Sequence, residues 1–167
     1  MLRVLTSPKT WAAATAVALA LAPAAPAMAA NTAIGHRAGA VPPTMVLDFN
    51  GTNDEASTGS TVGTGFGGSA TVKDSNGNKI ATAYDQCDKD SVTPASVTVF
   101  CAGQIVFNGS SDQIAFQVVA PIQDPKTAKY PLEFNGVVTG GTGQYEGLTG
   151  EIHFTNTSLA TYVISFG

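Results

Sequence analysis

Hydrophobic and polar residues alternate over several short stretches of the chain from residue 45 onward. In residues 45–50 every second side chain is a large apolar one, which places Met45, Leu47 and Phe49 on one side. This period of two is typical of a β-strand with one buried face. Further β-rich runs lie at residues 70–73, 79–85, 97–107, 114–120, 130–139, 150–155 and 160–166.

Turn-forming residues separate these runs. Asn76-Gly77 follows residues 70–73 and predicts a hairpin, because Gly accepts the positive φ of tight turns. Residues 51–68 are mostly Gly, Ser and Thr, which predicts a loop or a weakly formed edge strand. No stretch after residue 30 has the period of an amphipathic helix. Seven or eight short strands with turns between them favour an all-β domain, either a sandwich or a closed barrel.

The first 29 residues have the pattern of a secretory signal peptide. A short basic stretch precedes an Ala-rich apolar run at residues 11–21, and residues 27–29 offer small side chains for cleavage. The apolar run is about 12 residues long, whereas a helix needs about 20 to span a bilayer. A buried N-terminal helix is the alternative interpretation. We therefore expect a secreted protein without a membrane span, with a flexible arm at residues 30–44 and one domain at residues 45–167.

The amino-acid composition limits the functions that this protein can have. The 167 residues carry 8 basic and 12 acidic side chains, a net charge of −4, and only 12% of them are charged. Loss of Arg3 and Lys9 with the signal peptide would lower the net charge to −6. A nucleic-acid-binding face needs clustered basic residues, so this class is excluded. The 44% of hydrophobic residues is enough for a packed core and excludes a disordered chain.

Cys87 and Cys101 are the two cysteines of the chain, and thirteen residues lie between them. An even number of cysteines in an exported protein favours a disulfide bond, with free thiols as the alternative. Two cysteines without a nearby pair of histidines supply too few ligands for a metal site, so none is expected. Asp85, Asp88 and Asp90 form an acidic group near Cys87, for which a solvated loop is favoured over a Ca²⁺ site.

Residues 138–150, VTGGTGQYEGLTG, form the most specific segment of the chain. The glycines permit a tight reversal between two strands, with Tyr145 as an aromatic plug. A phosphate-binding loop is excluded because no Lys-Ser or Lys-Thr pair and no helix follows. The segment resembles the GGTGxFxGAxG-like signature of the allene oxide cyclase and dirigent superfamily, with Tyr145 in the place of the aromatic residue. Residues 78–87 and 45–50 are similar, more weakly, to a KRIGxTAG…C strand and to the first strand of that family.

This resemblance implies an antiparallel β-barrel of about eight strands with an apolar lumen, often assembled as a homotrimer. In the plant cyclases a Glu on the first strand and an Asn two residues later face the cavity, and Asp48 and Asn50 occupy these positions here. A carboxylate in an apolar lumen is able to act as an acid or base or to steer a polarised intermediate, so both are candidate catalytic residues. The alternative is that Asp48 is an ordinary solvent-facing strand residue. Candidate substrate-binding residues are Tyr84, Glu133, Asn135 and His153. The alternatives are a half-buried strand position for Tyr84 and outward-facing positions for the other three.

We therefore predict a secreted β-barrel that binds a small hydrophobic molecule and directs its cyclisation or isomerisation, mainly by holding one conformer. No cofactor is expected. A non-catalytic carrier or dirigent-like guide is one alternative, and a structural protein of the cell surface is another. Polar groups that converge inside the lumen would favour catalysis, whereas a filled lumen would favour the structural role. A slip of one residue exchanges the two faces of a strand, so the face that lines the lumen stays open.

Overall fold

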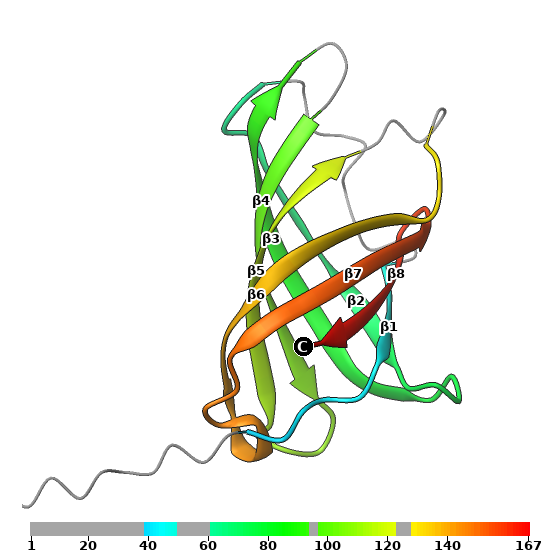
Figure 1. Ribbon diagram of the computed structural model, residues 1–167, viewed down its shortest axis with the longest axis vertical. Helices are drawn as coiled ribbons and strands as arrows, with labels where there is room; N and C mark the ends of the chain where they lie inside the picture. Colours follow the sequence, from blue (N-terminus) through cyan, green and yellow to red (C-terminus); the bar gives the residue numbers. More distant parts are fainter. Residues whose placement is uncertain (1–38, 50–60, 94–96, 123–127) are drawn as a thin grey trace, which may run out of the picture. The chain divides into compact units, whose positions relative to one another are not determined.

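The computed structural model describes residues 39–49, 61–93, 97–122 and 128–167, and within them the chain forms a closed antiparallel β-barrel (Figure 1). Each strand pairs with its neighbour in the sequence, and the last strand pairs with the first to close the barrel. This outcome confirms the predicted all-β barrel and excludes the sandwich. The strands are β1 (Met45–Asp48), β2 (Gly65–Lys73), β3 (Lys79–Val92), β4 (Val97–Phe107), β5 (Gln113–Ile122), β6 (Leu132–Thr142), β7 (Gly150–Ser158) and β8 (Thr161–Phe166).

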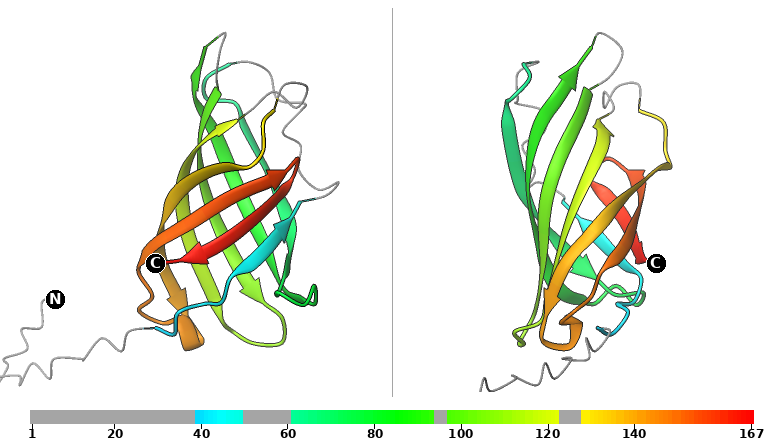
Figure 2. Two further views of the ribbon diagram at one scale, coloured as in Figure 1. Left: turned by 45° about the vertical axis from the view of Figure 1, so that its right-hand side comes forward. Right: turned by 60° about the vertical axis from the view of Figure 1, so that its left-hand side comes forward.

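Two strands, β2 and β3, are longer than predicted. β2 begins at Gly65, inside the Gly-rich stretch, and β3 continues to Val92. Both extensions are paired, since Gly65 lies opposite Asp88 and Phe66 lies opposite Cys87. Ladder hydrogen bonds and the burial of Phe66 therefore outweigh the low strand propensity of the glycines. Figure 2 shows these long strands curving around the barrel beside the shorter β1 and β8.

The hairpin between β2 and β3 forms where Asn76-Gly77 predicts it. Gly77 has a φ of 84°, a value that favours glycine. Oδ1 of Asp74 accepts hydrogen bonds from the backbone N–H groups of Asn76 and Asn78, at 2.9 and 2.8 Å. These bonds fix the turn and with it the register of the two strands.

One end of the barrel is filled with side chains. The short 3₁₀ helix η2 (Gly143–Tyr145) follows β6, and its Tyr145 ring lies 5.0 Å from the ring of Phe107, centroid to centroid. Tyr145 is 4% exposed, which confirms the predicted aromatic plug. A layer of fully buried aliphatic residues fills the adjacent part of the lumen: Met45, Val72, Ile105, Ile114, Ile152 and Ile164. Among the described residues, no helix is long and apolar enough to cross a membrane.

Candidate functional site

A cavity of about 80 Å³ lies inside the barrel, toward the end opposite Tyr145. Pro121 and Ile122 at the end of β5 and Leu159 and Ala160 between β7 and β8 form part of its rim. A water molecule occupies about 30 Å³ of liquid, so this space suits a headgroup or a small ring rather than a large ligand. Seven of the lining side chains are aromatic: Phe49, Phe66, Phe116, Tyr130, Phe134, Phe154 and Tyr162.

The aromatic rings on one side of the cavity pack against each other. Phe134 stacks on Phe154, with a centroid distance of 5.2 Å and an interplanar angle of 11°. Phe116 lies 5.5 Å from Phe154, and Tyr162 meets Phe49 edge to face at 5.8 Å. Offset and edge-to-face pairs of this kind are favourable beyond their buried area. The rings therefore form a wall held in place by its own contacts, from β5 round to β1.

Gly103 makes room for one of these rings. It lies directly opposite Phe116 in the pairing of β4 with β5. A Cβ at this position would lie 2.7 Å from Cε2 and 2.9 Å from Cε1 of Phe116, with Cζ nearer still. The ring of Phe116 thus covers the backbone of Gly103, because glycine has no side chain to prevent it.

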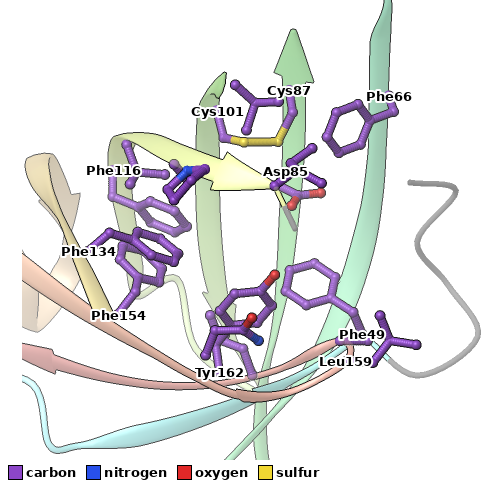
Figure 3. A pocket seen from close by; sticks show the side chains of 18 of the residues that line it. Phe49, Phe66, Asp85, Cys87, Cys101, Phe116, Phe134, Phe154, Leu159 and Tyr162 are labelled. Carbon is purple, nitrogen blue, oxygen red and sulfur yellow. A yellow bond between two sulfur atoms is a disulfide. The ribbon is translucent and has the colours of Figure 1, made fainter. Parts of the chain in front are cut away.

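Asp85 is the one acidic side chain among the described lining residues of the cavity. It lies on β3 between the inward-facing residues Ala83 and Cys87, and Figure 3 shows its carboxylate directed into the cavity. Oδ1 accepts a hydrogen bond of 2.8 Å from the backbone N–H of Gly68 on β2. Burial raises the pKa of Asp85 above its usual value, and the hydrogen bond from Gly68 opposes part of this rise.

The predicted disulfide bond between Cys87 and Cys101 is present. The two cysteines face each other across β3 and β4, with a Cα–Cα distance of 4.0 Å, and both line the cavity. Cys87 is the next inward-facing residue after Asp85 along β3. The bond therefore ties together the two strands that carry Asp85 and Gly103.

Asp48 lies on the outer face of β1. Leu47 and Phe49 take the inward positions on either side of it, and both line the cavity. Oδ2 of Asp48 accepts a hydrogen bond of 2.8 Å from Nζ of Lys73 on β2, at the partly exposed surface. The interior location that the resemblance implied for Asp48 is thus not observed, and its catalytic role stays a prediction. Asn50 lies outside the described residues.

The four predicted substrate-binding residues also lie on the outer face. Tyr84 is 53% exposed, next to the inward-facing Asp85. Glu133 and Asn135 are exposed on β6, where they alternate with residues that face inward. The structure brings Asn135 and His153 together across β6 and β7, with 2.8 Å between Oδ1 and Nδ1. None of the four lines the cavity, and their roles in ligand binding stay predictions.

Sequence reasoning did not single out Asp85 as a lumen residue. It placed Asp85 in an acidic group with Asp88 and Asp90, but these two are exposed on the outer face of β3 while Asp85 faces inward. The three carboxylates therefore do not converge. Ala83, Asp85 and Cys87 follow each other at a period of two, so a buried disulfide was the signal that could have located Asp85.

The fold and the cavity together define a small antiparallel barrel with an aromatic-lined lumen. No protein-family model matches the chain, and no curated protein sequence matches it. Among the similar solved structures is a pyocyanin demethylase, with a TM-score of 0.55 and 23% sequence identity. The match covers 74% of this chain and 99% of that one. This similarity supports the barrel fold, while the resemblance to the allene oxide cyclase and dirigent superfamily stays a resemblance.

Proposed function

We propose that this protein binds a small, largely apolar molecule in the barrel cavity and directs its cyclisation or isomerisation. The observation that carries the proposal is an aromatic cavity, inside a closed barrel, into which one carboxylate of the described residues projects. A rigid wall of rings favours one folded conformer of a flexible substrate, which is a large part of what such reactions require. The pyocyanin demethylase with a similar barrel is, by its name, a protein that processes a small molecule.

Asp85 is the residue we propose for proton transfer or for stabilising a polarised intermediate. Its raised pKa brings a carboxyl group closer to the range in which it exchanges protons at neutral pH. Its Oδ1 is anchored by Gly68, so the carboxylate is held in one place relative to the aromatic wall. Asn156 is a second polar lining residue, fixed by hydrogen bonds from Nδ2 to the carbonyl oxygens of Ser158 and Thr161 at 2.7 and 2.9 Å.

The small volume of the cavity indicates that it holds the reacting part of a ligand. Whole-ligand sites are commonly several hundred Å³ in volume, well above the roughly 80 Å³ of this cavity. Leu159 is 60% exposed at the rim, and Tyr130 is 37% exposed there. We propose that these two apolar surfaces contact the part of the ligand that extends out of the barrel.

Native mass spectrometry of the protein from its producing cells tests binding. We expect a co-purifying small molecule, which Ala120→Phe should displace, because Ala120 lines the cavity. Val119→Phe is the matched control, since Val119 is 57% exposed on the outer face of the same strand. Retention of the molecule by a folded Ala120→Phe variant would contradict binding in the cavity.

Turnover of the identified molecule tests catalysis. Under the proposal, Asp85→Asn lowers the reaction rate or changes the product ratio. The same assay on Asp48→Ala tests the carboxylate that the resemblance favours as catalytic. Binding without conversion by the wild type would instead support a non-catalytic carrier. That second candidate is favoured by the lining itself, in which Asp85 is the one carboxylate among the described residues.

The same spectra test export and assembly. We propose cleavage near residue 29, and the Cys87–Cys101 bond is compatible with an extracellular protein. The mass of the mature chain would report the cleavage site. The charge-state series would report whether the chain forms the homotrimer that the resemblance implies.

A further inference from the structure

We infer that the cavity is a site for a small organic cation, with the Asp85 carboxylate as its counter-ion and the aromatic wall as its cage. The inference rests on the proposed binding function and names the chemical class of the ligand. A quaternary ammonium group is the simplest member of this class. Three independent observations support it: the charge of the lining, the position of the rings, and the size of the space.

The charge of the described lining is negative and has no basic partner. Asp85 lines the cavity, and no Lys, Arg or His lines it among the described residues. Lys89 also faces inward on β3 and is buried, but it is four residues from Asp85 and does not line the cavity. Four strand residues span about 13 Å. The structure shows no ion pair between Asp85 and Lys89, both of which are described.

A buried carboxylate is costly unless it is paired or hydrogen-bonded. The hydrogen bond from Gly68 reaches Oδ1, and the carboxylate projects into the lumen. An entirely apolar ligand would remove the remaining water from this group and leave its charge unpaired. A cationic ligand would instead replace that water with an opposite charge, so the cavity favours a cation over a neutral molecule of the same shape.

The aromatic rings line the same cavity as Asp85, so a cation held beside the carboxylate would be surrounded by them. Asp85 is on β3, whereas Phe116, Phe134 and Phe154 are on β5, β6 and β7 across the barrel. Figure 3 shows these three rings grouped opposite the carboxylate, with Phe49 nearer to it. The faces of aromatic rings carry partial negative charge and attract organic cations, and sites for quaternary ammonium ligands use this effect.

The size of the cavity fits the same class. A trimethylammonium head is compact, which suits a cavity of about 80 Å³. The chain as a whole is acidic, with a net charge of −4, which favours the approach of cations over anions.

The test compares choline with 3,3-dimethyl-1-butanol, in which a carbon replaces the quaternary nitrogen and the shape is unchanged. Both are titrated by NMR into the wild type, Asp85→Asn and Asp88→Asn. Asp85→Asn keeps an oxygen for the Gly68 N–H, and Asp88→Asn removes the same charge from the exposed face of the same strand. We expect the wild type and Asp88→Asn to bind choline at least tenfold more tightly than the alcohol. In Asp85→Asn this preference falls at least several-fold, to what the aromatic rings alone supply.

Equal affinities in the wild type would overturn the inference, as would a preference for choline that is undiminished in Asp85→Asn. The comparison within the wild type needs no variant, so it decides the matter even where Asp85→Asn does not fold. Failure of both probes to bind the wild type would also overturn the cation site. The proposed function would then still be judged separately by the co-purifying molecule and its loss in Ala120→Phe.

Discussion

Replacing Gly103 with alanine should destabilise the barrel, although alanine is normally the better strand residue. The new Cβ would lie 2.7 and 2.9 Å from two ring carbons of Phe116, whereas carbon atoms in contact are about 3.5–4.0 Å apart. The ring would have to move by about 1 Å. The centroid of the Phe154 ring is 5.5 Å away, so a shift of the Phe116 ring toward it would displace a second aromatic group, and a shift the other way would give up their contact.

The expected magnitude follows from two opposing effects. Overpacking of a core costs about 1–3 kcal/mol, while Gly→Ala in a strand gains about 0.5–1 kcal/mol. We therefore expect Gly103→Ala to lower the free energy of unfolding by roughly 1–2 kcal/mol. Urea denaturation followed by far-UV circular dichroism measures this change, provided that the m-value stays constant.

A double-mutant cycle separates this clash from other causes. Phe116→Leu removes the ring atoms that Gly103→Ala would meet, so the double variant should lose less stability than the sum of the two single variants. An alanine variant as stable as the wild type would refute the reasoning. Strict additivity with Phe116→Leu would show that the loss has a different origin.

Three further predictions concern the carboxylates and the disulfide. Because the pKa of Asp85 is higher in the folded than in the unfolded state, the folded state binds more protons, and stability falls as the pH rises through this range. The free energy of unfolding of Asp85→Asn minus that of the wild type should therefore increase above about pH 4. Thermal melts of both proteins across pH 3–8 that show a constant difference would contradict this prediction. Reduction of the Cys87–Cys101 bond, with its sequence separation of 14, should lower stability by about 3 kcal/mol in chemical denaturation, and an unchanged midpoint would be the contrary result. Asp48→Asn should lower the free energy of unfolding by less than about 1 kcal/mol, because the ion pair with Lys73 is partly exposed. The affinity of this variant for choline should stay within about twofold of the wild type. A larger loss of affinity would connect Asp48 to the cavity.

The fold could be predicted from the sequence to a large extent because its signals are local. Alternation at a period of two, the Asn76-Gly77 turn and Tyr145 within its glycines each indicate structure within a few residues. The disulfide followed from the number of cysteines and the expected compartment. The beginning of β2 at Gly65 was missed because it depends on pairing with β3, which no local pattern reveals.

The candidate site was harder to predict because it depends on which face of each strand is inside. The resemblance favoured Asp48 as a lumen residue, but Leu47 and Phe49 occupy the inward positions of β1. Asp85 was treated as part of a charged loop, since two further acidic residues follow it closely. Only the register of β3, with Cys87 inside, separates the inward carboxylate from the exposed ones. A period of two shows which residues of a strand share a face, but it does not show which of the two faces is buried.

Tyr145 fills one end of the lumen, and the cavity lies toward the other end. Under the proposed function, substrate and product would share the rim at that other end, so a slow release of product would delay the next substrate. The rim positions differ in how far the fold depends on them. Pro121 and Leu159 are exposed, whereas Ala160 has a φ of 64° and its carbonyl oxygen accepts a hydrogen bond of 2.9 Å from the Phe49 N–H. A library randomised at Pro121 and Leu159, with Ala160 kept, would therefore be an economical starting point for selecting barrels with new ligands.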